Sequence, residues 1–122
     1  MKNILFDRGV PEELRERLAP HQITLLRERG WSELQNGKLL RQAELEFDIL
    51  VTTDTNIKHQ QNLSNFALAI LVLRAFKISL PRYLTVLPEI LAQIETLEAG
   101  QITYVYADEP LRRRDEQKGN RK

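Results

Sequence analysis

Two aspartates follow segments that have the length and composition of buried strands. Asp7 comes directly after residues 4–6, and Asp54 follows residues 49–53. If those strands are parallel neighbours, both carboxylates lie at the carboxyl-end edge of one sheet, where α/β proteins bind ligands. Carboxylates suit a hard cation such as Mg²⁺, which can activate a bound water and stabilise displacement at phosphorus. Aspartates after strands also cap turns and helices, so the spacing leaves both interpretations open.

The segment after Asp54 is rich in side chains that form hydrogen bonds. The amides of Asn56 and Gln60 can hold water, phosphate or a base. His59 can act as a general base, because the unperturbed pKa of histidine lies near neutrality. No second histidine or cysteine lies at ligand spacing, so no zinc site is expected there. A solvated His59 without a chemical role is the alternative interpretation.

Other polar and aromatic residues lie around the third predicted strand. Asp48 precedes that strand, and six extended residues span about 20 Å, so Asp48 is expected at the opposite edge from Asp54. Glu33 lies in the loop before the helix that precedes this strand, and Asn36 is the N-cap of that helix. Either side chain can approach the carboxyl-end edge. Trp31 can stack on a base or cover the core.

The apolar pattern alternates between strand-like and helix-like segments, which is typical of an α/β fold. Strands are expected at residues 2–6, 22–26, 49–53, 67–73 and 101–106. Helices are expected at residues 10–18 and 36–46 and from about residue 80 to 99, with Pro88 kinking or restarting the last one. The unbroken apolar run in the third strand indicates burial on both faces. The prediction is a three-layer α/β/α sandwich with a mainly parallel sheet of about five strands.

Composition restricts the classes of protein. The chain has 122 residues, which corresponds to one domain, and it has no cysteine, which excludes disulfides and thiolate sites. The apolar run at residues 66–73 is too short to cross a bilayer, and no signal-peptide pattern is present, so a cytoplasmic protein without membrane contact is expected.

Charge is unevenly distributed along the chain. Residues 108–122 carry six basic and four acidic residues, whereas the other 107 residues carry 12 basic and 13 acidic residues and are nearly neutral. Binding to a nucleic acid would therefore need a local patch or the run Arg112-Arg113-Arg114. The tail lacks apolar periodicity and is predicted to be charged and disordered.

Four motifs together resemble the small bacterial PIN-like proteins, often described as the PIN-like toxin component of toxin–antitoxin pairs and similar to the Mut7-C type of PIN domain. The motifs are Leu5-Phe6-Asp7-Arg8-Gly9-Val10-Pro11, Gly30-Trp31-Ser32 with Asn36-Gly37-Lys38-Leu39-Leu40, Asp48-Ile49-Leu50-Val51-Thr52-Thr53-Asp54, and Gln60-Gln61-Asn62-Leu63. The resemblance covers residues 2–106. It implies a PIN-like domain at residues 1–107, followed by the tail at 108–122.

The resemblance also implies a chemistry, namely an acidic pocket that binds Mg²⁺ or Mn²⁺ and cuts RNA. Asp7 and Asp54 match the metal-binding and catalytic acids of such a pocket. The remaining expected site residues are Asn36 as a catalytic residue, and Arg8, Asn56, His59 and Gln60 as substrate-binding residues. Many relatives carry an acid at the positions of Arg8 and Asn36, so this pocket holds less negative charge.

Two functions follow as alternatives. The first is a metal-dependent ribonuclease of the toxin type, and the second is a catalytically weak or inactive PIN-like module that binds RNA or a cognate antitoxin protein. The resemblance also implies a homodimer, because PIN-like domains commonly form dimers. Leu84, Leu87 and Leu91 can contribute to such a contact, although the apolar stripe to which they belong favours a role in the core for each.

Overall fold

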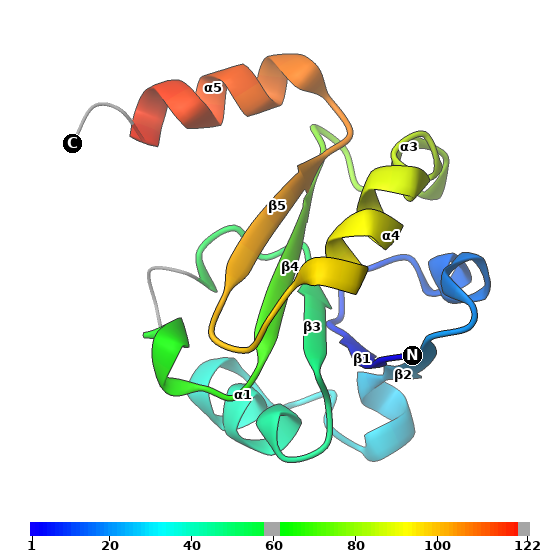
Figure 1. Ribbon diagram of the computed structural model, residues 1–122, viewed down its shortest axis with the longest axis vertical. Coiled ribbons are helices and arrows are strands. Elements are labelled where there is room, and N and C mark those ends of the chain that lie inside the picture. Colours follow the sequence, from blue (N-terminus) through cyan, green and yellow to red (C-terminus); the bar gives the residue numbers. More distant parts are fainter. Residues whose placement is uncertain (58–61, 120–122) are drawn as a thin grey trace.

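The five strands form one sheet in which every neighbouring pair is parallel (Figure 1). The structure is a computed structural model that describes residues 1–57 and 62–119. The strand order is β2-β1-β3-β4-β5. The strands are β1 (Asn3–Phe6), β2 (Gln22–Leu25), β3 (Ile49–Thr52), β4 (Ala69–Arg74) and β5 (Ile102–Tyr106). The predicted parallel sheet is confirmed, with the fifth strand at an edge.

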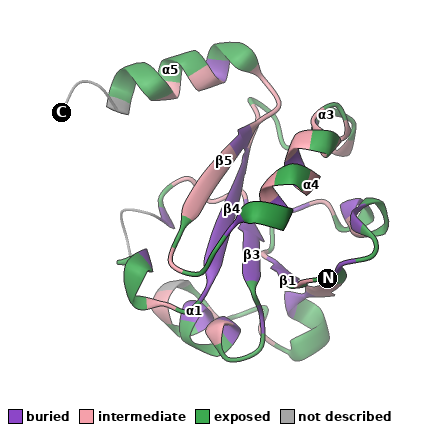
Figure 2. Cartoon of the chain, in the orientation of Figure 1, coloured by how far each residue is buried: buried purple, intermediate pink, exposed green. Residues whose placement is uncertain are grey.

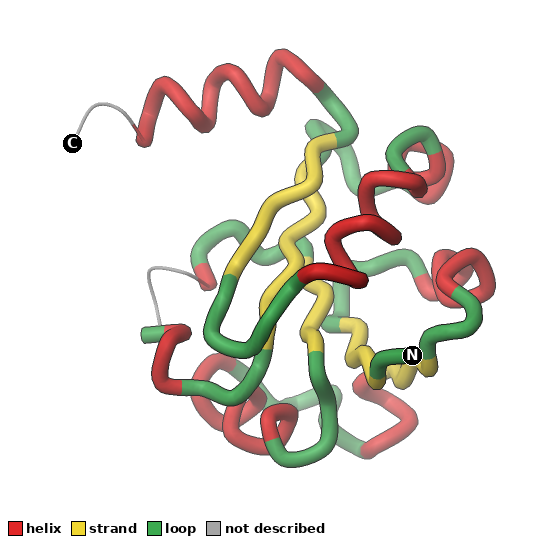
Figure 3. The backbone as a smooth tube through the Cα atoms, in the orientation of Figure 1, coloured by secondary structure: helices red, strands yellow, loops and turns green. Residues whose placement is uncertain are grey.

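Helices cover both faces of the sheet, which confirms the α/β sandwich. One face packs against η1 (Glu12–Leu18), α3 (Leu80–Leu84) and α4 (Leu87–Thr96). The other face packs against η2 (Leu26–Arg29), α1 (Asn36–Glu44) and η3 (Leu63–Asn65). A last helix, α5 (Glu109–Gly119), lies across the end of the sheet where β5 ends (Figures 1 and 3).

Alternation along the central strands divides the core into two layers. Ile49 and Val51 of β3 join the cluster under α3 and α4, whereas Leu50 joins the cluster under α1. All four residues of β3 are buried, and Figure 2 shows β3 and β4 almost entirely in the colour of buried residues. Burial on both faces explains the unbroken apolar run in the sequence.

The order of the strands places a topological switch point between β1 and β3. β1 pairs with β2 on one side and with β3 on the other, and Phe6 is the register partner of Val51. Connections from the two central strands therefore leave toward opposite faces. In open parallel sheets, ligands bind in the crevice at such a point, beyond the carboxyl ends of the strands.

Two helix predictions differ from the structure in detail. The predicted helix at residues 10–18 is the 3₁₀ helix η1, in which Leu14 N–H donates to Pro11 O. Its short length and buried contacts at Leu14 and Leu18 do not require full α-helical turns. Gln35 is the N-cap of α1 in place of Asn36, and the Gln35 side chain forms no capping hydrogen bond with the described residues.

The prediction of a disordered tail is wrong for residues 109–119, which form α5. Leu111 is buried, and Arg74 forms a bidentate ion pair with Asp115 at 2.8 and 3.0 Å. Tyr106 also donates a hydrogen bond to Asp115 at 3.0 Å. The partners that fix α5 lie in the body of the protein, so the tail's own composition does not reveal them.

The predicted dimer stripe packs within the chain. Leu84, Leu87 and Leu91 are partly buried against the core cluster beneath α3 and α4. Across residues 1–57 and 62–119, no helix is long and apolar enough to cross a membrane.

Candidate functional site

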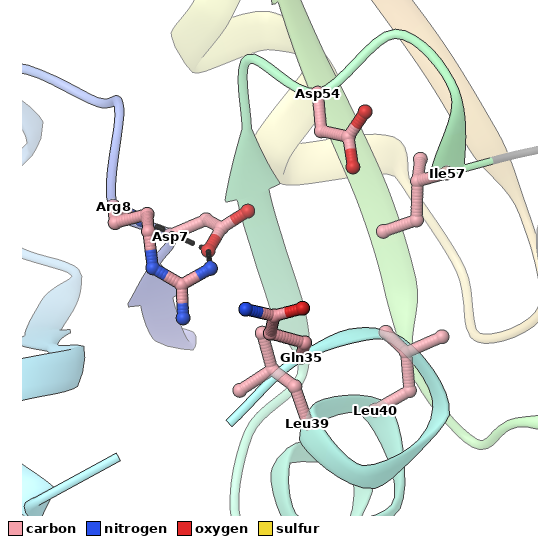
Figure 4. Close-up of a pocket in the computed structure, with 7 residues that line it drawn as sticks. All are labelled: Asp7, Arg8, Gln35, Leu39, Leu40, Asp54 and Ile57. Carbon is pink, nitrogen blue, oxygen red and sulfur yellow. Dashed lines mark hydrogen bonds and ion pairs between the residues drawn. The ribbon is translucent and has the colours of Figure 1, made fainter. Parts of the chain in front are cut away.

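Asp7 and Asp54 line one pocket at the switch point between β1 and β3. The pocket has a volume of about 350 Å³. Figure 4 shows the carboxylate of Asp54 directed into it from above, with Asp7 on one side and the start of α1 below. The lining residues are Asp7, Arg8, Gln35, Leu39, Leu40, Asp54 and Ile57. The prediction that the two strand-end aspartates share an edge is therefore confirmed.

Short hydrogen bonds fix the orientation of Asp7. Its Oδ2 accepts a hydrogen bond from Thr52 Oγ1 at 2.8 Å, and its Oδ1 accepts one from the Arg8 N–H at 2.9 Å. Its own N–H donates to Val51 O at 2.9 Å, which continues the pairing of β1 with β3. The side chain is only 13% exposed, so the carboxylate is held in one position at the wall of the pocket.

Thr52 connects the two aspartates. This residue is fully buried, and its Oγ1 accepts a hydrogen bond from the Asp54 N–H at 3.0 Å while it donates to Asp7. Asp54 Oδ1 in turn accepts the Asn56 N–H at 2.9 Å, which closes a tight turn. One hydroxyl therefore positions the Asp7 carboxylate and the backbone of Asp54 relative to the sheet.

Arg8 lies at the margin of the pocket and joins it to the segment that precedes α1. Its Nη2 donates to the carbonyl oxygens of Ser32 and Leu34 at 2.7 and 2.6 Å. Its Nη1 lies 3.9 Å from Asp7 Oδ1, and the side chain is about half exposed. Arg8 thus anchors the loop that brings Gln35 to the pocket, and it also places a positive charge beside Asp7.

Together, Asp7 and Asp54 suit a hydrated divalent ion. Within the described part of the chain, no group of three or more His, Cys, Asp or Glu side chains converges as a metal site. Each oxygen of Asp7 accepts one protein hydrogen bond, and a carboxylate oxygen has room for a further interaction. Mg²⁺ commonly binds through one or two carboxylates and completes its shell with water and phosphate. The donor set therefore fits Mg²⁺ or Mn²⁺ in that form, and does not fit an ion enclosed by protein alone.

The other predicted residues are distributed differently. Asn56 is exposed and contributes its backbone N–H to Asp54. Asn36 is the first residue of α1, beside Gln35, and its side chain is outside the described part of the structure, as are residues His59 and Gln60. Asp48 lies at the opposite edge as predicted, where its Oδ2 accepts the Asn3 N–H at 2.9 Å.

Trp31 packs against the core and does not stand free as a stacking surface. Its ring meets Phe47 edge-on at a centroid distance of 6.1 Å. The Arg29 guanidinium lies 5.5 Å from its centre. The interpretation of Trp31 as a cover over the core is the one that the structure supports.

Sequence reasoning missed Thr52 and Gln35. Thr52 has the same strand parity as Asp54, so its side chain was predictable as a neighbour of Asp54 on one face of the sheet. A polar residue in a fully buried strand also needs a partner, which was a second signal. Gln35 carries no such signal, because only the fold of residues 32–35 brings it to the pocket.

Comparison with protein-family models, curated proteins and solved structures finds no significant match to this chain. The chemistry of this protein is therefore inferred from the residues around the pocket, which are two carboxylates, a buried hydroxyl and a guanidinium, together with the sequence motifs that contain them.

Proposed function

We propose that this protein is a PIN-like, metal-dependent ribonuclease of the toxin type. The observation that carries the proposal is the convergence of Asp7 and Asp54 from adjacent parallel strands on one pocket at the switch point. The PIN-like motifs give that acidic pocket a substrate, because the chemistry they imply is hydrolysis of RNA phosphodiester bonds.

Each residue around the pocket then has a chemical task. Asp7 and Asp54 would hold Mg²⁺ or Mn²⁺, which would supply an activated water and stabilise negative charge on the phosphate. Thr52 holds the Asp7 carboxylate and the Asp54 backbone in place, and the remaining N–H groups of Arg8 donate to a phosphate oxygen. Gln35 orients water with its amide. Hydrolysis joins a water oxygen to phosphorus, breaks a P–O bond and delivers a proton to the leaving oxygen.

Cleavage of labelled RNA by purified protein in Mn²⁺ tests the proposal. Asp54→Asn removes a charge from the pocket and is expected to lower the rate by about 100-fold or more. Asp48→Asn makes the same change at the opposite edge of the sheet and is expected to retain the wild-type rate. Equal residual activity in wild type and Asp54→Asn would assign the cleavage to a contaminant and contradict the proposal.

The second candidate is an inactive PIN-like module that binds RNA or an antitoxin protein. The observation in its favour is Arg8, whose Nη1 lies 3.9 Å from Asp7 Oδ1 in a pocket that only two described carboxylates line. A positive charge at that distance opposes a cation and suits a phosphate directly. RNA binding without Mn²⁺ binding would favour this candidate over the nuclease.

A further inference from the structure

Exposed apolar side chains gather on the connection between β4 and α3. Phe76 is 59% exposed and Ile78 is 52% exposed, and the exposed Lys77 lies between them. Among the described residues, the other large exposed apolar side chains are Met1 and Leu45. Exposed apolar side chains that lie close together commonly mark a binding surface, and an aromatic ring among them offers a face on which a flat group can stack.

The ring of Phe76 is already half of a stacked pair. The guanidinium of Arg114, on α5, lies over it with Cζ 5.7 Å from the ring centre. The loop beneath is fixed, because the Phe76 N–H donates to Asp108 Oδ2 at 2.9 Å and Arg82 pairs with the other oxygen of Asp108. Phe76 and Arg114 together form a platform that is held in place before any ligand binds.

This platform lies at the same edge of the sheet as the acidic pocket. β4 is paired with β3, and Thr52 is the register partner of Val72. The Cδ1 of Ile78 lies 3.9 Å from the ideal Cβ position of Gly9, two residues after Asp7. Adjacent strands are about 4.8 Å apart, so the ends of β3 and β5 are separated by about 10 Å. Figure 1 shows α5 passing over this edge beyond β5.

We propose that Phe76 and Arg114 form a base-stacking subsite for single-stranded RNA that crosses the carboxyl-end edge toward Asp7 and Asp54. Aromatic rings and guanidinium groups stack on the faces of unpaired bases, and neighbouring cations follow the phosphates. Lys77, Arg113 and Arg114 supply those cations, and none of the three has an ion-pair partner in residues 1–57 and 62–119. The identity of the ligand as RNA rests on the proposed function.

Fluorescence anisotropy of a labelled single-stranded RNA, measured in EDTA, tests the subsite without cleavage. Phe76→Ala is expected to weaken binding by about five-fold or more. Leu45→Ala removes another exposed apolar side chain, which lies after α1 at the other end of the sheet, and is expected to leave the affinity unchanged. Phe76→Trp is expected to restore binding, and circular dichroism of each variant confirms folding.

A second pair of variants tests the cation without altering the ring. Arg114→Gln is expected to weaken RNA binding, whereas Arg17→Gln, at an exposed position on η1, is expected not to. An RNA of the same length that lacks bases is expected to bind wild type and Phe76→Ala equally. Loss of affinity on that abasic strand as well would overturn the stacking role.

Other outcomes also decide the matter. RNA affinity that is absent in the wild type, or unchanged in both Phe76→Ala and Arg114→Gln, overturns the subsite. A shift of Phe76→Ala to a smaller species in sedimentation, with RNA affinity unchanged, also overturns it and assigns the platform to a second copy of this chain. If the wild type binds RNA and both Phe76→Ala and Arg114→Gln weaken that binding, but no Mn²⁺-dependent cleavage occurs, the subsite is supported and only the proposed nuclease activity is contradicted.

Discussion

The two edges of the sheet use aspartates in different ways. At the amino-end edge, Asp48 is occupied by the backbone, because Oδ2 accepts the Asn3 N–H, its N–H donates to Asn3 O, and its carbonyl accepts the Ala69 N–H. At the carboxyl-end edge, the Asp7 carboxylate accepts hydrogen bonds from Thr52 Oγ1 and the Arg8 N–H, the Asp54 carboxylate accepts one from the Asn56 N–H, and both still face a pocket. Asp48 joins strands, whereas the other two remain available to a ligand.

Cavity volume does not explain this difference. A cavity of about 440 Å³ lies beside Asp48, against about 350 Å³ at the acidic pocket. What separates the edges is the topology, since the switch point between β1 and β3 brings two strand-end carboxylates together at one edge only. A buried hydroxyl then fixes the Asp7 carboxylate and the backbone of Asp54.

Thr52→Val is expected to have the largest effect on the carboxyl-end edge and none on the amino-end edge. It removes the hydroxyl that donates to Asp7 and accepts from Asp54, and it leaves a backbone N–H without a partner. We expect the free energy of unfolding to fall by about 2 kcal/mol. We also expect Mn²⁺ affinity to fall by roughly 10-fold or more. Urea denaturation and calorimetric titration measure the two effects.

Thr52→Ser is the matched control, because it keeps the hydroxyl and removes only a methyl group. Its Mn²⁺ affinity should stay close to that of the wild type, and its stability should fall by about 1 kcal/mol. If Thr52→Val bound Mn²⁺ as tightly as Thr52→Ser, the hydroxyl would have no part in positioning the carboxylates.

Much of this arrangement was predictable from local sequence. The strands, their parallel pairing and the meeting of Asp7 with Asp54 follow from apolar runs and from the general position of ligands in such sheets. The contribution of Arg8 to the loop at residues 32–34 was not predictable, because carbonyl acceptors leave no mark in a sequence. The same holds for α5, whose docking depends on Arg74 and Tyr106.

Asp48→Ala should lower the stability by a smaller amount and leave the metal site unchanged. The Asn3 N–H loses its acceptor at a partly solvated edge, so the free energy of unfolding is expected to fall by about 1 kcal/mol. Mn²⁺ affinity and RNA cleavage should not change. Urea denaturation together with the cleavage assay checks this, and reduced Mn²⁺ affinity in this variant would remove the distinction between the two edges.

Alkaline pH should loosen the carboxyl-end edge slightly, through Tyr106. Burial, followed by the hydrogen bond to Asp115, raises the pKa of Tyr106 to about 12. The folded state therefore favours the neutral phenol, whose contribution is complete below the ordinary pKa of about 10 and is lost as the pH rises toward 12.

Tyr106→Phe isolates this effect. The wild type should be slightly more stable than Tyr106→Phe below pH 10, and the difference should shrink as the pH rises toward 12. Unfolding in urea at a series of pH values, followed by circular dichroism, measures the gap. A gap that stayed constant across this range would show that Tyr106 ionises equally in the folded and unfolded chains.

Calorimetric titration with Mn²⁺ tests the central claim most directly, with one aspartate changed at a time. We expect the wild type and Asp48→Asn to bind one Mn²⁺ with the same affinity, and Asp7→Asn and Asp54→Asn each to lose most of that binding. Equal Mn²⁺ binding by all four proteins, or none by the wild type, would contradict the assignment of a metal site to Asp7 and Asp54.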